Sequence, residues 1–210
     1  MTRDEFIRRA EALHIERAEL VGGRVYIMAP MLRKHARSDG FITGVFMVYA
    51  AATPGCEVVP NATCFVGEDA PQPDSCLRIL KEFGGASSEG ADGYIHGAPE
   101  LVAEICETSA NYDLHDKLEL YQTNGVKEYV AILLRKQEIR WHLLVSTKYQ
   151  RVPVPQDHVF RSVVFPGLWL DSQALLAGDS AKLLAVLNAG LASPEHAAFV
   201  RQLENQKRPG

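Results

Sequence analysis

Long apolar runs, metal-binding cysteine pairs and an excess of basic residues are all absent from this chain of 210 residues. A membrane-spanning helix needs an apolar run of about eighteen residues or more, and no such run occurs. The start of the chain, Met1 to Phe6, also lacks the basic-then-apolar pattern of a secretory signal. We therefore expect a soluble, cytoplasmic protein that does not enter membranes.

The cysteines are few and scattered, and the overall charge is slightly acidic. The four cysteines form no C-x-x-C pair and none has a histidine at zinc-finger spacing, so neither a structural zinc site nor a disulfide framework is indicated. The formal net charge of −4 argues against a general nucleic-acid coat protein, because such a protein would be strongly basic. A nuclease with a local basic patch is still compatible with this charge.

What is present is enough apolar material for one sizeable core. Apolar residues make up 47% of the chain, so a single domain over residues 1–210 is expected. The alternation of strand-like and helix-like segments indicates an α/β or mixed α+β domain.

Hydrophobic spacing and turn residues place these segments along the chain. Helices are predicted from a cap at Asp4 and at residues 34–52, 113–124, 180–189 and 194–205. Strands are predicted at residues 19–28, as a hairpin around Gly22-Gly23, and at residues 56–59, 63–66, 75–80, 101–106, 128–134, 139–145 and 162–170. Residues 81–99, rich in glycine, serine and acidic side chains, predict a mobile surface loop. Strand, helix and strand over residues 101–134 predict a crossover unit.

An acidic residue, Glu104, interrupts an otherwise apolar predicted strand. Side chains two positions apart on a strand face the same way, so Val102, Glu104 and Cys106 share one side of the sheet. A carboxylate buried in that row costs free energy unless a cation or hydrogen-bond donors compensate its charge. A hard divalent ion such as Mg²⁺ takes oxygen ligands of this kind, so a metal is the simplest compensation.

Further residues complete a candidate metal site around Glu104. Asp74 opens the apolar run 75–80, and if the two strands are neighbours, Asp74 and Glu104 can hold one ion from two sides. The carbonyl of Ile105 could complete the shell of that ion. Lys117, in the next predicted helix, is placed to orient or deprotonate an attacking water or to neutralise transition-state charge. This combination indicates metal-assisted hydrolysis of a phosphodiester.

Each of these side chains also has a structural interpretation. Asp74 could cap a turn after Pro73, and Glu104 could lie on an edge strand or in an internal salt bridge. Lys117 could form a solvated pair with Asp113, four residues earlier on the same predicted helix.

His35 lies in a basic cluster, residues 33–37, at the start of a predicted helix. It could belong to a solvated face, contact a DNA phosphate or hold a metal ligand in place without contacting the ion itself. Cys106 is interpreted as a small buried filler, because no fixed cation or helix terminus is evident to activate its thiol.

The motifs resemble, as a set, those of a known family. They are residues 97–109, Asp113, Lys117, Tyr121, residues 125–129, residues 19–23, residues 28–30, His35, Pro73-Asp74 and residues 165–168. In sequence and order they are similar to the signature of the Uma family of restriction endonucleases, within the PD-(D/E)xK nuclease superfamily. The resemblance covers roughly residues 19–170 and leaves a C-terminal helical extension, about 172–206, outside it.

The resemblance implies a fold and an activity. The implied core is a restriction-endonuclease-like mixed sheet flanked by helices, here with an N-terminal helix and hairpin and two C-terminal helices. The implied activity is cleavage of DNA that depends on Mg²⁺ or Mn²⁺. Asp74 matches the first acidic position of the family and Glu104 the second.

The chain departs from the superfamily pattern at one informative position. The superfamily lysine usually follows the second acid by two residues, where this chain has Cys106. Similar family members carry the lysine in the next helix instead, which makes Lys117 the corresponding residue. The strand at residues 129–132 lacks the tryptophan and trailing aspartate often found in the family, a change that leaves the site residues intact.

We therefore expect an endonuclease that acts on DNA, with a homodimer favoured for cleavage of two strands. One alternative is a catalytically inactive relative that binds nucleic acid or a protein, and a missing acid or lysine would be its mark. Another is an enzyme with a substrate other than nucleic acid, favoured by the acidic charge and the lack of a long basic stripe.

Overall fold

The computed structural model describes residues 1–106 and 115–207. The first half of the chain contains α1 (Arg3–Ala12), β1 (Ala18–Val21), β2 (Arg24–Ile27), α2 (Arg33–Ala52), β3 (Cys56–Pro60), β4 (Cys64–Phe65), β5 (Ser75–Ile79), the short 3-10 helix η1 (Lys81–Phe83), β6 (Ser88–Glu89), β7 (Ile95–His96) and β8 (Leu101–Cys106). The second half contains α3 (Lys117–Thr123), β9 (Glu128–Leu133), β10 (Glu138–Val145), β11 (Lys148–Arg151), β12 (Val159–Arg161), β13 (Trp169–Asp171), α4 (Ser172–Ala177), α5 (Ser180–Leu191) and α6 (Pro194–Gln206).

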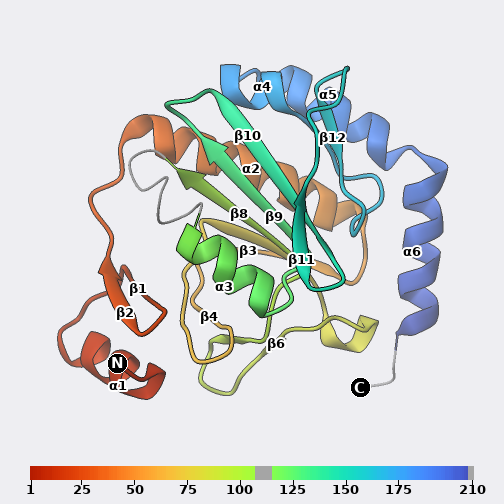
Figure 1. Ribbon diagram of the computed structural model, residues 1–210. Coiled ribbons are helices and arrows are strands. Elements are labelled where there is room, and N and C mark those ends of the chain that lie inside the picture. Colours follow the sequence, from red (N-terminus) through yellow and green to blue (C-terminus); the bar gives the residue numbers. More distant parts are fainter. Residues whose placement is uncertain (107–114, 208–210) are drawn as a thin grey trace.

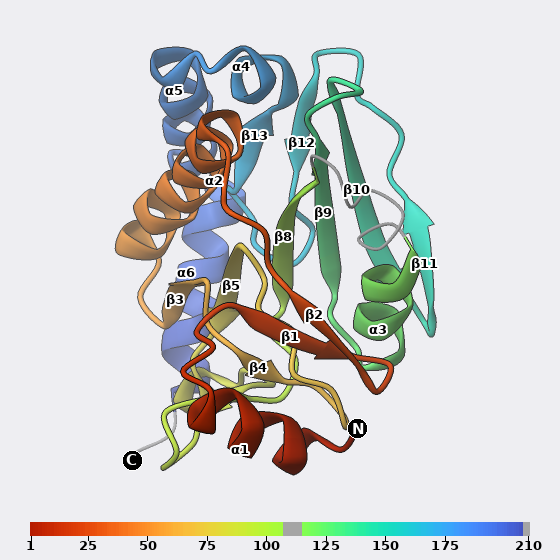
Figure 2. The same cartoon turned by 90° about the vertical axis from the view of Figure 1, so that its left-hand side faces the viewer.

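A mixed sheet forms the centre of the described structure. Its six strands lie in the order β11-β10-β9-β8-β5-β3, and β8 pairs with β9 in parallel while the other neighbours are antiparallel. Helix α2 covers one face of this sheet and α3 the other, as Figures 1 and 2 show from two directions. The mixed sheet flanked by helices confirms the expected fold class.

Strand β8 shows why the sheet needs a helix on each face. Leu101, Ala103 and Ile105 pack in the cluster that contains the apolar side of α2. Val102 and Cys106 pack in a second cluster with the apolar residues of α3. The alternation predicted for this strand is therefore confirmed, and Glu104 lies on the face that α3 covers.

The crossover unit is confirmed as β8, α3 and β9. Helix α3 begins at Lys117 and its predicted start at Asp113 lies outside the described residues. Gly125, with a φ of 83°, follows the helix in the left-handed conformation that glycine adopts without steric cost. This turn returns the chain to the sheet beside β8.

Residues 81–99 differ from the predicted surface loop. They contain η1, β6 and β7, and β6 and β7 join β4 in a three-stranded sheet in the order β4-β7-β6. The buried carboxylate of Glu100 accepts hydrogen bonds from the N–H groups of Ile79 (2.8 Å) and Ala86 (2.9 Å). These two hydrogen bonds hold residues 81–99 against the end of β5. They explain why this segment follows a defined path although its composition is typical of a loop.

The predicted start of the first helix and the predicted strand at 162–170 were both wrong in detail. The side chain of Thr2, rather than that of Asp4, caps α1 by accepting a hydrogen bond from the N–H of Glu5. Of the predicted strand 162–170 only Trp169 and Leu170 lie in a strand, β13. Residues 162–168 form the turn that joins β13 to β12, which ends at Arg161, and the N–H of Ser162 donates to the carbonyl of Leu168.

Three elements of the second half, β11, β12 and α4, had no prediction. Strand β11 is mostly exposed, so it lacks the apolar alternation that identifies strands. Helix α4 precedes the two predicted C-terminal helices and is only 6 residues long, too short for a helical period to stand out.

Within the described ranges no single helix is long and apolar enough to cross a membrane; α5 and α6 meet that length and hydropathy test only as a pair bent by 63°.

Gly85 is predicted to be essential for the path of residues 81–99. A Cβ atom at Gly85 would lie 1.7 Å from the carbonyl oxygen of Ile79, so Gly85→Ala must displace the backbone at the end of β5. We expect a loss of more than about 2 kcal/mol in the free energy of unfolding, measured by urea denaturation. Gly40→Ala is the control: open space surrounds Gly40 in α2, and this helical position should gain about 0.5–1 kcal/mol. Equal effects of the two substitutions would contradict the packing.

Candidate active site

The pairing of β5 with β8 brings Asp74 beside Glu104. Ser75 lies opposite Ala103 in this antiparallel pair, so Asp74, one residue before β5, comes next to Glu104. The N–H of Ile105 donates a hydrogen bond to Asp74 Oδ2 (2.7 Å). The condition set by the sequence, that the two strands be neighbours, is therefore met.

His35, near the start of α2, approaches Asp74 from the other side. Its Nε2 lies 3.1 Å from Asp74 Oδ1. This hydrogen bond with Asp74 raises the pKa of His35 above its ordinary value, against the opposing effect of burial. His35 therefore touches a candidate metal ligand directly, rather than belonging to a fully solvated face.

Lys117 and Tyr121 converge on one oxygen of Glu104. Lys117 Nζ lies 2.8 Å from Glu104 Oε1, and the hydroxyl of Tyr121 donates to the same oxygen at 2.7 Å. Both donors come from α3, four residues apart and so on the same face of the helix. Glu104 is only 3% exposed and Lys117 only 2%, so this contact is shielded from water.

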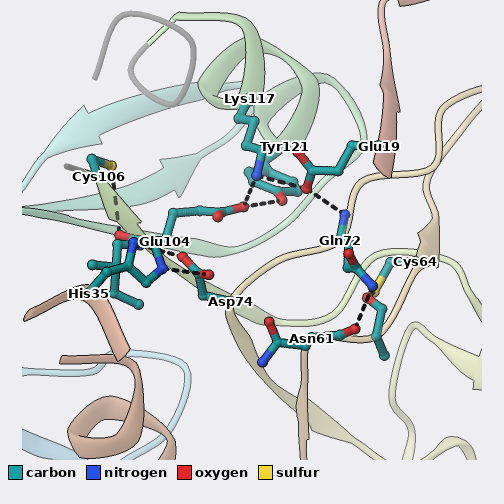
Figure 3. Close-up of polar contacts among 12 residues, drawn as sticks. Glu19, His35, Asn61, Cys64, Gln72, Asp74, Glu104, Cys106, Lys117 and Tyr121 are labelled. Carbon is teal, nitrogen blue, oxygen red and sulfur yellow. Dashed lines mark hydrogen bonds and ion pairs between the residues drawn. The ribbon is translucent and has the colours of Figure 1, made fainter. Parts of the chain in front are cut away.

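Glu19 is a further member of the site, and our sequence reasoning did not assign it a role. It is fully buried in β1, and its Oε1 accepts a hydrogen bond from the N–H of Gln72 (2.6 Å) and forms an ion pair with Lys117 Nζ (2.8 Å). The sequence does contain an indication of this role, because Glu19 interrupts the apolar run Ala18–Val21 in the same way as Glu104 interrupts its own strand. Figure 3 shows Lys117 between the two glutamates.

Tyr121 is held in its protonated, donating form. Burial is the main cause that raises the pKa of Tyr121 well above its ordinary range, and the negative charges of Glu104 and Glu19 add to it. The phenol therefore supplies a permanent hydrogen bond to the carboxylate of Glu104.

Some structural interpretations of these residues are wrong. Lys117 is not solvated, and Glu104 does not lie on an edge strand, because β8 runs between β5 and β9. The alternative of an internal salt bridge does describe Glu104, which pairs with Lys117. Asp113, the other predicted partner of Lys117, lies outside the described residues.

The donor set fits a hard divalent ion. Asp74 and Glu104 lie beside each other on adjoining strands, and the pKa of the nearby Asp39 is raised, mainly by burial and then by the negative charge of Asp74. Among the described residues no three histidine, cysteine, aspartate or glutamate side chains converge to hold an ion by themselves. An ion held by Asp74 and Glu104 would therefore complete its shell with a main-chain oxygen or water, as Mg²⁺ commonly does.

Removal of the Lys117 ammonium should destabilise the protein strongly. In Lys117→Met two buried carboxylates lose their shared cation, and we expect the free energy of unfolding to fall by about 3–5 kcal/mol in urea denaturation. Addition of Glu19→Gln to this variant removes one uncompensated charge and should restore part of the loss. Lys182→Met is the matched control: its ion pair with Asp171 involves an exposed lysine and should contribute less than about 1 kcal/mol. A similar loss in both methionine variants would contradict the buried ion pair.

Comparisons with known proteins agree with this fold. A comparison with curated proteins gave no match. Among solved structures, the chain resembles the crystal structure of "a putative nuclease belonging to DUF820" from Anabaena variabilis ATCC 29413. The TM-score is 0.66 at 15% sequence identity, over 84% of this chain and 98% of the other, which shows a shared fold. The model of the Uma2 family, described as "Putative restriction endonuclease", matches residues 3–173, and the chain belongs to that family.

Proposed function

We propose that the protein is an endonuclease that hydrolyses phosphodiester bonds in DNA with the help of Mg²⁺ or Mn²⁺. The observation that carries the proposal is the meeting of Asp74 and Glu104 on adjoining strands, with the ammonium of Lys117 on a Glu104 oxygen. Two carboxylates and a lysine at one buried point match the chemistry expected of the family to which the chain belongs.

Asp74 and Glu104, with the carbonyl of Ile105, are the proposed metal ligands. A bound divalent ion would polarise a phosphate oxygen and lower the pKa of a coordinated water. The N–H of Ile105 keeps the carboxylate of Asp74 turned toward β8. Each carboxylate oxygen can accept more than one interaction, so these hydrogen bonds are compatible with a cation.

Lys117 is the proposed electrostatic group. An ammonium is a donor without acceptor capacity, and here it lies between two carboxylates, so it suits stabilisation of negative charge better than removal of a proton. Glu19 and Tyr121 are positioning residues, since the first holds Lys117 and the second holds Glu104. His35 would support Asp74 in the same way.

Cleavage of both strands of a duplex would need two such sites, and a homodimer is part of the proposal for this reason. The acid pair and the lysine are all in place, so the chain does not carry the mark expected of a catalytically inactive relative.

Relaxation of supercoiled plasmid DNA tests the proposed function. We expect the protein to nick or linearise plasmid in Mg²⁺ or Mn²⁺ and to be inactive in EDTA. Asp74→Asn and Glu104→Gln should each lower the rate by at least about a hundredfold, because a metal ligand loses its charge while its shape is kept. Lys117→Ala should lower it as well.

Two controls accompany this assay. Glu82→Gln makes the same chemical change at an exposed position and should retain full activity. Thermal unfolding gives a second readout: Mg²⁺ should raise the Tm of the parent protein but not that of Glu104→Gln. Equal nicking by all variants would point to a contaminant and end the proposal.

A further inference from the structure

Two donors already occupy one oxygen of Glu104. Its Oε1 lies 2.8 Å from the ammonium nitrogen of Lys117 and accepts a hydrogen bond from the hydroxyl of Tyr121 at 2.7 Å. An ionised carboxylate oxygen has about two lone-pair sites, so these donors use both sites of Oε1. A divalent ion at the proposed metal site would therefore share the carboxylate of Glu104 with the ammonium of Lys117.

An ammonium and a divalent ion on one carboxylate repel each other. The repulsion is stronger here than at a surface, because Glu104 and Lys117 are both buried and little water screens their charges. While Lys117 stays bound to Glu104, the affinity of the site for a divalent ion is lowered. Binding of the ion and the contact between Lys117 and Glu104 are thus in competition.

Glu19 gives the ammonium a second acceptor. Its Oε1 also lies 2.8 Å from Lys117 Nζ, and it belongs to β1 rather than to the central sheet. Figure 3 shows Asp74 next to Glu104, and Glu19 on the other side of the ammonium. Lys117 can therefore lose Glu104 as a partner and still keep its charge paired.

The position of Glu19 is tied to the segment that carries Asp74. Two of the residues 71–73, Pro-Gln-Pro, have no N–H group, so Gln72 has the only main-chain donor there, and it donates to Glu19 Oε1 at 2.6 Å. The side-chain amide of Gln72 donates to the carbonyl of Asn61 (2.9 Å), and the N–H of Asn61 donates to the carbonyl of Asp74 (3.1 Å). These contacts do not involve α3, so Glu19 keeps its place when the ammonium changes partners.

We propose that Glu19 allows an ion to bind at the metal site by taking over the ammonium: when a divalent ion binds, Lys117 gives up Glu104 and remains bound to Glu19. The inference rests on the proposed function, because it concerns the metal ligands of that function. The N–H that Lys117 withdraws from Glu104 can then donate to an oxygen of the phosphate to be cleaved. Glu19 therefore sets the affinity of the site for a divalent ion as well as the position of Lys117.

Binding of Mn²⁺ to the full chain without DNA tests this exchange. Free Mn²⁺ is measured by electron paramagnetic resonance, so the readout does not depend on cleavage. Glu19→Gln should raise the Kd for Mn²⁺ by about tenfold, because an amide is a weaker acceptor for an ammonium and leaves Lys117 on Glu104. Glu104→Gln should abolish the binding, which verifies that the measured ion is at the proposed site.

A double variant separates competition from a simple loss of charge. Glu19→Gln combined with Lys117→Met has the same net charge as the parent protein, so long-range electrostatics predict an unchanged Kd. Because no ammonium occupies Glu104 in this variant, we expect it to bind Mn²⁺ at least about threefold more tightly than the parent. It also has one uncompensated carboxylate fewer than Lys117→Met alone, and circular dichroism checks that it is folded.

Glu82→Gln is the matched control, because it makes the same chemical change as Glu19→Gln at an exposed position on η1. It should leave the Kd for Mn²⁺ within about twofold of the parent value.

The outcomes separate this inference from the proposed function. Equal Kd values for Glu19→Gln and Glu82→Gln, or a double variant that binds no more tightly than the parent, would overturn the inference and leave the endonuclease proposal standing. A parent protein that binds no Mn²⁺, or binds it equally well after Glu104→Gln, would overturn both. Weaker binding by Glu19→Gln together with tighter binding by the double variant would support the inference.

Discussion

The ammonium of Lys117, held between the carboxylates of Glu19 and Glu104, is the interaction on which the site depends. All three charged groups are removed from water. The burial of each charge costs roughly several kcal/mol of folding free energy unless partners compensate it. The three groups come from α3, β1 and β8, so the compensation exists only when the helix, the hairpin and the central sheet are docked together. The same contacts that order the candidate catalytic groups therefore also join the elements that carry them.

Much of the site could be predicted because its carboxylates break the patterns of their strands. Glu104 stands in an apolar row, and a group that is costly to bury in such a position calls for a cation. Asp74 could be linked to it only by assuming that their strands pair, which the antiparallel register of β5 and β8 provides. Glu19 follows the same logic, but its strand is short and belongs to a hairpin outside the central sheet, so nothing local to it pointed to Glu104. Lys117 lies 13 residues after Glu104 but connects it to Glu19 from a distant part of the chain, and such long-range contacts leave no local pattern.

The fold shows the same division between local and long-range causes. Helix α2 and strands β8 to β10 were predictable because periodicity decides them, and their faces are filled as that periodicity requires. The segment 81–99 was not, because its structure depends on Glu100, whose side chain accepts hydrogen bonds from two distant N–H groups. A buried carboxylate used as an acceptor for backbone N–H groups looks the same in the sequence as one that serves a metal. Burial alone therefore does not separate Glu100 from Glu104; the cationic and phenolic donors around Glu104 do.

The helical origin of the lysine changes what holds Glu104 in place. Cys106, at the position where the superfamily pattern has a lysine, packs as a small apolar side chain in the cluster between β8 and α3. A lysine at position 106 would lie on the same strand as Glu104, and its position would not also place Tyr121 at the site. On α3, Lys117 and Tyr121 are one turn apart, so a single helix delivers an ammonium and a phenol to the same oxygen. The orientation of Glu104 is consequently set by the docking of α3, and not by the strand that carries it.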